Sequence, residues 1–425
     1  MPAGRADAAP RQYVVAGVAS MVGTTIEWYD FFLYGTAAAL IFNKLFFPAF
    51  DPLTGTLAAF ATYAVGFLAR PLGAVVFGHF GDRVGRKSML LATLFLMGVP
   101  TMAIGLIPTY ESIGYGAAVL LVLMRFLQGM AVGGEWGGAA LMAVEHAPPG
   151  RQAFFGSLPQ AGVGAGLILS SLAMAAVSQL PEEDFLSWGW RLPFLASVLL
   201  LVVGVFIRLK VAESPVFEAL KKTSAPVDLP VVEVFRRHPR VVLTAIGARA
   251  AETTWFYTVV TFSLTYVTQQ LGLSRALALD AVVVGALVSL VTIPLAGLAS
   301  DRYGARRVFM TGAALLCGAP LLFFALLATR DTALLFCAMA MAIGGVFPLL
   351  YAPQSALFAA QFPAEVRYSG ISLSVQLTGA LAGGAAPIVA TSLLRAGDGD
   401  PWLISVYLVS LAVLALFCAW QLKKA

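Results

Sequence analysis

The chain has 425 residues, of which 59% are hydrophobic and only 12% are charged. Soluble proteins carry about 25% charged residues, so this composition excludes an ordinary soluble domain and indicates a membrane protein. The net charge of +5 calls for no nucleic-acid partner, because the basic residues follow a pattern typical of membrane proteins.

Twelve apolar runs are long enough to cross a hydrocarbon core of about 30 Å as helices. They cover residues 13–42, 55–79, 88–109, 114–144, 153–179, 190–209, 240–269, 277–300, 307–328, 332–360, 369–394 and 402–422. The sequence therefore predicts an all-α membrane protein with twelve transmembrane helices.

The basic residues of the connections lie mostly on one side of the predicted bundle. Of the 27 Lys and Arg residues, three lie deep within spans, and nineteen lie in the connections or at the span ends of one side, including Arg5, Arg208 and Lys424. The other side holds five: Lys44, Arg191, Arg275, Arg330 and Arg395. Because basic loops stay in the cytoplasm, we expect both termini to be cytoplasmic. Residues 1–12 show no cleavable signal peptide.

A charged phrase between the second and third spans returns in the second half of the chain. Its first copy reads Gly78-His79-Phe80-Gly81-Asp82-Arg83-Val84-Gly85-Arg86-Lys87, and its second reads Gly297-Leu298-Ala299-Ser300-Asp301-Arg302-Tyr303-Gly304-Ala305-Arg306. The offset is 219 residues, about half the chain. We therefore predict two pseudo-symmetric six-helix lobes, residues 1–209 and 240–425. The polar stretch 210–239 is interpreted as a cytoplasmic linker rather than a binding element.

Few ionisable residues fall within the spans, and each is a candidate functional residue because charge is costly in hydrocarbon. They are Glu27 and Asp30 on the first span, Arg70 on the second, Arg125 and Glu135 on the fourth, and Arg249 and Glu252 on the seventh. Three arginines and four carboxylates nearly cancel, so some of them must pair.

Glu27 and Asp30 are three residues apart and share one helix face near mid-membrane depth. Loss of water and mutual repulsion favour protonation of one of them at neutral pH. Asp30 is therefore the first candidate for a coupling proton, with Glu27 and Glu135 next and Arg125 as the movable cation. A purely structural pairing is the alternative for each of them. Arg249 and Glu252 are also placed to form a pair of their own.

Aromatic and amide side chains surround these charges and suit the binding of a small polar solute. With Arg70, Arg125, Arg249 and Glu252, the substrate-binding candidates are Trp28, Tyr29, Tyr34, Gln160, Trp255, Tyr257, Tyr351, Gln354 and Gln376. For any one aromatic, packing or anchoring at the membrane interface is the alternative.

Catalytic and metal-binding signatures are not evident. Gly85-Arg86-Lys87-Ser88 lacks the spacing of a phosphate-binding loop, and the three cysteines, all within spans, suggest neither a disulfide framework nor a metal site. We expect no enzyme activity, no cofactor and no metal, so transport must draw on an ion gradient or on the gradient of the solute.

The charged phrase resembles the signature between the second and third spans of the major facilitator superfamily, and Arg125-Phe126-Leu127-Gln128-Gly129 resembles its fourth-span motif. Four further segments are similar to the metabolite:proton symporter branch, which includes shikimate, α-ketoglutarate and proline/betaine permeases. They are Glu27-Trp28-Tyr29-Asp30-Phe31, Phe67-Leu68-Ala69-Arg70-Pro71-Leu72-Gly73, Gly133-Gly134-Glu135-Trp136-Gly137-Gly138-Ala139 and Ser187-Trp188-Gly189-Trp190-Arg191-Leu192-Pro193-Phe194.

The resemblance implies proton-coupled uptake by alternating access, with Asp82 and Arg83 as inner-gate residues and Arg125 in coupling or substrate binding. We extend the gate to Arg86, Asp301 and Arg302. Ala305 replaces Arg86 in the second copy, so its gate contacts are expected to be weaker. The chain ends just past the last span, and we expect no osmotic sensing.

The sequence thus favours a monomeric symporter of the bacterial inner membrane that imports a small organic acid, shikimate-like or dicarboxylate, with protons. A zwitterion symporter and an exporter or exchanger of the same fold are alternatives. A solute sensor and a membrane enzyme are further alternatives, disfavoured by the short loops and the missing catalytic residues.

Overall fold

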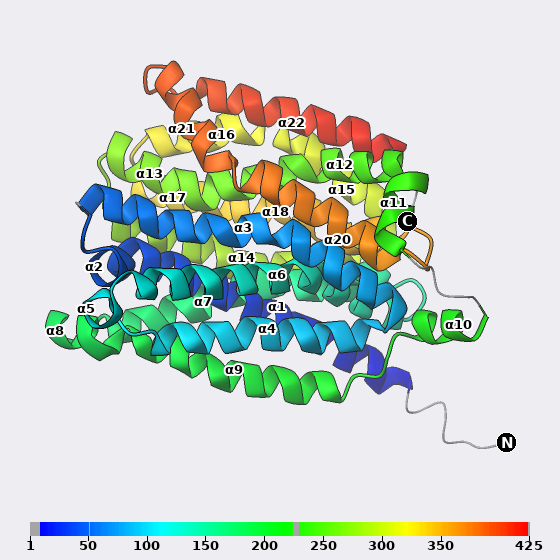
Figure 1. The fold of residues 1–425 in the computed structure, drawn as a ribbon. Helices are drawn as coiled ribbons and strands as arrows, with labels where there is room; N and C mark the ends of the chain where they lie inside the picture. The colour runs from blue at the N-terminus through cyan, green and yellow to red at the C-terminus, as the bar shows by residue number, and fades with distance from the viewer. Residues whose placement is uncertain (1–8, 51, 224–228, 424–425) are drawn as a thin grey trace.

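Each of the twelve predicted spans is helical in the computed structural model, which describes residues 9–50, 52–223 and 229–423 (Figure 1). The helices of the first half are α1 (Ala9–Ala37), η1 (Ala38–Phe42), α2 (Asn43–Phe46), α3 (Pro52–Arg83), α4 (Arg86–Leu106), α5 (Tyr110–Ile113), α6 (Tyr115–His146), α7 (Gln152–Val177), α8 (Glu182–Asp184), η2 (Phe185–Gly189) and α9 (Arg191–Leu209). Two short helices follow, α10 (Pro215–Thr223) and α11 (Pro230–Arg237).

The second half is more often interrupted. Its helices are α12 (Pro239–Tyr257), η3 (Thr258–Phe262), α13 (Ser263–Thr265), η4 (Tyr266–Gln270), α14 (Arg275–Tyr303), α15 (Ala305–Leu316), α16 (Ala319–Ala328), α17 (Thr332–Met339), η5 (Ala340–Val346), α18 (Phe347–Tyr351), α19 (Gln354–Ala359), α20 (Arg367–Thr378), η6 (Gly379–Gly383), α21 (Ala386–Ala396) and α22 (Trp402–Gln421). Arg5, Lys424 and the first eight residues, where the signal-peptide expectation falls, lie outside the described part.

The fold is all-helical and membrane-spanning, although apolarity alone does not reproduce the count of twelve spans. In the described residues, nine helices are long and apolar enough to cross a membrane, and the bent pair α15 and α16 makes a tenth. The two remaining spans, α1 and the α12–η4 segment, carry Glu27, Asp30, Arg249 and Glu252. These charged residues lower the hydropathy of both segments.

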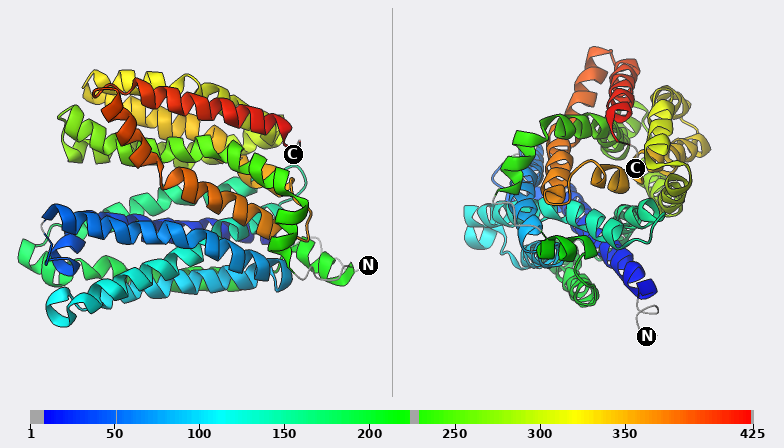
Figure 2. Two further views of the ribbon diagram at one scale, coloured as in Figure 1. Left: turned by 45° about the horizontal axis from the view of Figure 1, so that its top comes forward. Right: turned by 90° about the vertical axis from the view of Figure 1, so that its right-hand side faces the viewer.

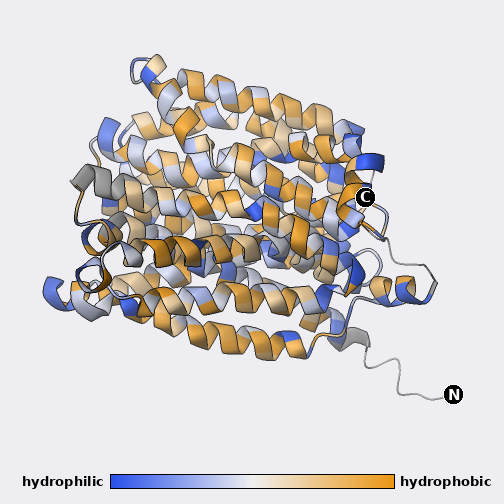
Figure 3. Cartoon of the chain, in the orientation of Figure 1, coloured by the Kyte–Doolittle hydropathy of each residue, from blue (hydrophilic) through white to orange (hydrophobic). Residues whose placement is uncertain are grey.

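The two halves form separate groups of helices that lie side by side (Figure 2). They meet along two pairs of long helices, α3 against α20 and α7 against α14. The lateral surface of the bundle is mostly apolar and polar residues gather at its ends, as a lipid-embedded bundle requires (Figure 3).

The duplicated phrase forms the same turn in both halves. Gly85 separates α3 from α4 with φ +133°, and Gly304 separates α14 from α15 with φ +95°. Side chains other than glycine are strained at these angles, which explains why glycine occupies both positions. We call the end of the bundle that carries these two turns the basic end.

Candidate functional site

A central cavity lies between the two halves, midway along the bundle. Residues from α1, α3, α6 and α7 face residues from α12, α18, α20 and η6 across it. The lining residues are Glu27, Trp28, Arg70, Val132, Trp136, Val163, Arg249, Glu252, Thr253, Phe256, Tyr257, Phe347, Tyr351, Val375, Gln376 and Gly379. The space between them measures about 510 Å³ with adjoining open solvent included. Both predicted classes of residue, charged and aromatic, therefore meet in one place.

Arg70 of α3 brings a positive charge into this cavity. Its guanidinium carbon lies 4.3 Å from the ring centre of Phe67 and 5.1 Å from that of Phe31. The buried ion pairs of the described residues involve Arg86, Arg208, Arg249 and Arg367, and Arg70 belongs to none of them. Cation–π contacts stabilise its charge only in part, so Arg70 is well suited to receive an anionic group.

Arg249, by contrast, is held by partners of its own half. Glu252 Oε2 lies 3.8 Å from Arg249 Nη1, as their spacing on one helix suggested. Gln354 joins the pair, because it accepts a hydrogen bond from Arg249 and donates one of 3.1 Å to Glu252. Arg249 also stacks on Trp136 of the first half at 4.8 Å. This triad leaves little free charge on Arg249.

Glu27 and Asp30 have different neighbours, although they share the interior face of α1. Glu27 lines the cavity, and its Oε2 has no hydrogen-bond partner. Asp30 accepts a hydrogen bond of 2.6 Å from Thr101, which in turn accepts one of 2.7 Å from Gln128. Gln128 then accepts one of 3.2 Å from Arg125. Two side chains thus connect Asp30 to Arg125.

Arg125 lies one layer behind the cavity. Its guanidinium carbon is 4.5 Å from the ring of Tyr34, 4.7 Å from that of Tyr63 and 5.4 Å from that of Phe31. Phe31 is also the ring on which Arg70 rests. A movement of Phe31 would therefore affect both arginines.

The other sequence-predicted binding residues fall into two groups. Trp28, Tyr257, Tyr351 and Gln376 line the cavity, as do Arg70, Arg249 and Glu252. The second group bonds elsewhere. Gln160 donates a hydrogen bond to Ser355 of the other half, and Tyr29 donates one to the carbonyl of Pro193. The Tyr34 hydroxyl contacts that of Thr62, and Trp255 donates a hydrogen bond to the carbonyl of Ala342. The lining residues Trp136, Phe256 and Phe347 were not predicted from the sequence, because aromatic residues are frequent throughout the spans.

At the basic end, each half caps a helix of the other half. Asp82 at the end of α3 accepts hydrogen bonds from the backbone N–H of Tyr368 and Ser369, at 3.1 and 2.9 Å. Asp301 at the end of α14 accepts them from Ala153 and Phe154, at 2.8 and 2.9 Å. Carboxylates at the N-termini of α20 and α7 are stabilised by the helix dipoles. The phrase therefore forms two reciprocal clamps between the halves.

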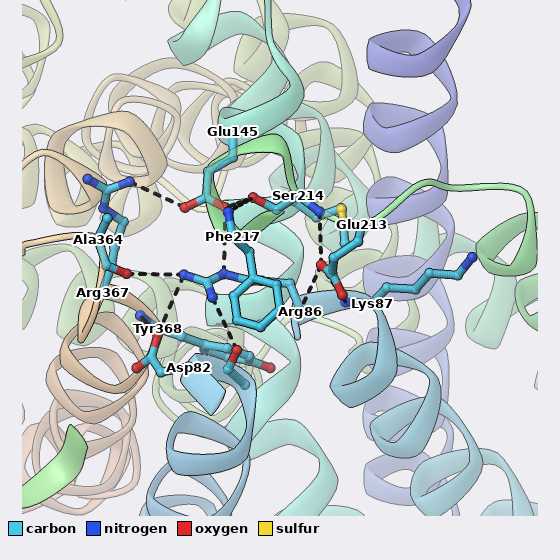
Figure 4. Close-up of polar contacts among 12 residues, drawn as sticks. Asp82, Arg86, Lys87, Glu145, Glu213, Ser214, Phe217, Ala364, Arg367 and Tyr368 are labelled. Carbon is cyan, nitrogen blue, oxygen red and sulfur yellow. Dashed lines mark hydrogen bonds and ion pairs between the residues drawn. The ribbon is translucent and has the colours of Figure 1, made fainter. Parts of the chain in front are cut away.

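Arg86 strengthens the first clamp (Figure 4). Its guanidinium lies 3.6 Å from Asp82 and 3.6 Å from Glu145, and donates 3.2 Å hydrogen bonds to the carbonyls of Gly81 and Ala364. Glu145 also pairs with Arg367 of α20 at 3.3 Å. Ala305 takes the place of Arg86 in the second copy, so this hub of contacts belongs to the first clamp.

Two of the three predicted gate arginines, Arg83 and Arg302, are exposed. Arg83 contacts His79 of its own helix at 3.5 Å, and Arg302 stacks on Tyr303 at 5.3 Å. The buried cation of the clamp is Arg86. The sequence pattern could not separate these positions, because both basic residues follow Asp82 within one helical turn.

Family profiles match both halves of the chain. A sugar (and other) transporter profile matches residues 15–228, and a Major Facilitator Superfamily profile matches residues 244–424. The shikimate transporter of Escherichia coli is 41% identical over 96% of this chain and 94% of its own length. The proline/betaine transporter of Salmonella typhimurium is 32% identical over 96% of this chain and 82% of its own length.

The chain belongs to the major facilitator superfamily, in its metabolite:proton symporter branch. A solved structure supports the fold: the proton:xylose symporter XylE has a TM-score of 0.78 at 15% identity, covering 98% of this chain and 97% of its own. The major facilitator protein described here is a multi-pass membrane transporter and not an enzyme. An inner membrane metabolite transport protein of Escherichia coli is 40% identical to it over 94% of this chain and 91% of its own length.

In this transporter, the segment after α9 packs on the first clamp and is not a separate loop. Glu213 accepts hydrogen bonds from the backbone N–H of Arg86 and Lys87 at 3.1 and 3.2 Å and so caps α4. Ser214 donates to Glu145, and the ring of Phe217 covers Arg86 at 4.8 Å. The start of the predicted linker thus packs against the residues of the first clamp.

A buried cation that the sequence places among the basic residues at the span ends completes the charge balance of the transporter. Arg208, in the last turn of α9, is 3% exposed and pairs with Glu135, which also accepts a 2.7 Å hydrogen bond from Thr93. The excess of one carboxylate over the arginines within the spans was the signal for it. Glu135, a predicted proton-coupling residue, is therefore also part of a structural ion pair.

Glu135→Gln is expected to destabilise the protein strongly, because it leaves the charge of Arg208 buried without a carboxylate. Breaking a buried pair from one side costs about 3–5 kcal/mol. We expect the melting temperature of the purified protein to fall clearly, and Glu135→Gln with Arg208→Met to restore most of it. An unchanged melting temperature in the single variant would contradict a structural role for the pair.

Proposed function

We propose that this transporter imports a small organic acid together with protons by alternating access. One observation carries the proposal: Arg70, which belongs to no ion pair of the described residues, brings its positive charge into a cavity whose walls also hold Glu27 and aromatic rings. An entering carboxylate gains an ion pair there without displacing an existing one. The 41% identity with the shikimate transporter supports a cyclic hydroxy acid as the first substrate to test.

Asp30 and Glu27 are the proposed carriers of the coupled proton. Both are buried, each keeps one carboxylate oxygen without a hydrogen-bond partner, and neither belongs to an ion pair of the described residues. A buried carboxyl group without a cation is more stable with its proton bound. Asp30 is connected to Arg125 through the side chains of Thr101 and Gln128. We infer that protonation of Asp30 affects the cavity through this connection.

The proposed cycle uses the two halves, residues 1–209 and 240–425, as lobes that rock about the cavity. The basic end, with both clamps formed, is proposed to be the closed cytoplasmic side, with both termini on that side. The structure would then represent a state that accepts substrate from outside. Separation of α3 from α20 and of α7 from α14 would open the cavity inward.

A zwitterion such as proline or betaine is the second candidate substrate. It is supported by Glu27, whose unpartnered oxygen lies in the same cavity as Arg70, and by aromatic walls that suit a cationic group. The 32% identity with proline/betaine transporters supports it less strongly than the shikimate relative supports an acid.

A thermal-shift screen of the purified protein against shikimate, dicarboxylates, aromatic acids, proline and betaine tests the substrate class. We expect shikimate to raise the melting temperature and Arg70→Gln to weaken that binding about tenfold to a hundredfold, because a hydrogen bond to a charged group contributes about 1.5–3 kcal/mol.

Arg275→Gln is the matched control, since Arg275 is exposed at the end opposite the basic end. Stabilisation by betaine or proline but not by acids would favour the zwitterion. Binding of shikimate that is equal in Arg70→Gln and in the unaltered protein would contradict the assignment of Arg70. Counterflow of substrate without proton uptake by vesicles would indicate an exporter or exchanger.

A further inference from the structure

The short helix α11 stands across the basic end at the rim of the bundle, roughly perpendicular to the long helices (Figure 1). It contacts α3 of the first half and both α12 and α20 of the second half. Pro230 and Val234 face these helices and are buried. The helix therefore bridges the two halves beside the clamp formed by Asp82.

The other face of α11 carries large apolar side chains that are about half exposed. Val232 is 54% exposed, Phe235 is 49% exposed and Leu229, just before the helix, is 58% exposed. Two large apolar side chains on an eight-residue helix, with a third just before it, would be unusual in contact with water. In the view from the basic end, α11 lies at the edge of the bundle and not over its centre (Figure 2). The exposed face of α11 is therefore the one turned away from α3, α12 and α20, at the periphery of the bundle where lipid surrounds it.

The charges around α11 mark the depth at which it lies. Arg236 on α11 and Arg240 at the start of α12 are exposed. Leu243, one turn further along α12, is 67% exposed and suits a hydrocarbon environment. The surface therefore changes from apolar to basic within one helical turn, as it does at a membrane–water interface. Glu233, the acidic residue of α11, is neutralised by Arg237 at 2.6 Å.

We propose that α11 is an interfacial helix that binds anionic phospholipid of the membrane leaflet at the basic end. Val232 and Phe235 enter the acyl boundary, while Arg236 and Arg240 contact lipid phosphates, the arrangement of amphipathic helices on anionic membranes. Because α11 contacts both α3 and α20, its lipid-bound position stabilises the state in which the basic end is closed. This inference does not depend on the identity of the transported solute.

The test is a lipid titration of the full chain in detergent, with melting temperature as the readout. Phosphatidylglycerol is expected to raise it, whereas phosphatidylcholine of the same acyl chains does not. Arg236→Gln with Arg240→Gln should require about thirtyfold more phosphatidylglycerol for half of the effect, since each basic group near an anionic surface contributes about fivefold. Lys221→Gln with Lys222→Gln, which removes the same charge from α10, should titrate like the unaltered protein.

Two further arms separate a lipid surface from a simple phosphate site. Val232→Ser with Phe235→Ser keeps both arginines. Because Val232 and Phe235 are exposed, the substitutions should not disturb folding. This variant should lose most of the rise in melting temperature that phosphatidylglycerol causes. Glycerol phosphate should give no shift at the lipid concentrations used. Three results would each overturn the proposal. They are equal phosphatidylglycerol titrations of the unaltered protein and of Arg236→Gln with Arg240→Gln, a full rise in melting temperature in the serine variant, and a full rise with glycerol phosphate.

Discussion

Asp30→Asn is expected to abolish proton-driven accumulation of substrate while leaving substrate exchange across the membrane intact. The amide cannot take up and release a proton, yet it can still accept the hydrogen bond from Thr101. The packing of α1 should therefore change little. In proteoliposomes with an imposed proton gradient, uptake should fall by at least about tenfold, a difference of about 1.4 kcal/mol.

Asp280→Asn is the control for this experiment, because Asp280 is an exposed acid on α14 far along the helix from Asp301. It should leave gradient-driven uptake unchanged. Undiminished accumulation by Asp30→Asn would show that the coupling proton lies elsewhere, and Glu27→Gln would then be the next variant to measure.

Asp82→Asn is expected to open the basic end of the bundle. The substitution removes the charge that faces the N-terminus of α20 and can keep only one of two backbone hydrogen bonds. It also leaves Arg86 without one of its two nearby carboxylates. A charge-assisted hydrogen bond contributes about 1.5–3 kcal/mol, so the equilibrium should shift about tenfold to a hundredfold toward the inward-open state.

The reporter for this shift is Ser372→Cys in a protein whose three native cysteines are replaced by alanine. Ser372 is fully buried against Gly137 of the other half, and its hydroxyl has no hydrogen-bond partner. Reaction with a maleimide that does not cross the membrane, in inside-out vesicles, should be faster with Asp82→Asn. Asp280→Asn again serves as control, and equal rates in both proteins would contradict a clamp at Asp82.

The repeat of the charged phrase predicted the two-halved fold, but it did not predict which of its basic residues is buried. Two copies at a constant offset indicated two similar halves, and Asp82 and Asp301 do occupy equivalent positions against opposite helices. The pattern predicted a gate role for both Arg83 and Arg86, yet of these two only Arg86 is buried. Which basic residue turns inward depends on Glu145 and Glu213, which lie far away in sequence.

The charged residues within the spans predicted part of the lining of the central cavity. Charge is costly in contact with lipid in any arrangement of the helices, so these residues face the interior of the bundle. Their partners could not be predicted, since pairing depends on contacts between distant helices. Glu135 pairs with Arg208 of α9, and Gln354 of α19 joins Arg249 to Glu252. The six short π-helices in the described part of the chain, two of them within the α12–η4 segment, likewise had no signal in the apolar periodicity.

The proton stoichiometry of uptake tests the central claim most directly. Weakly buffered vesicles that contain the purified protein are exposed to shikimate in the absence of a sodium gradient, and external pH is recorded together with labelled uptake. Proton-coupled import predicts that the external medium becomes more alkaline as substrate enters, and that Asp30→Asn loses this change. Uptake with no change in external pH, or uptake that requires a sodium gradient, would contradict the account.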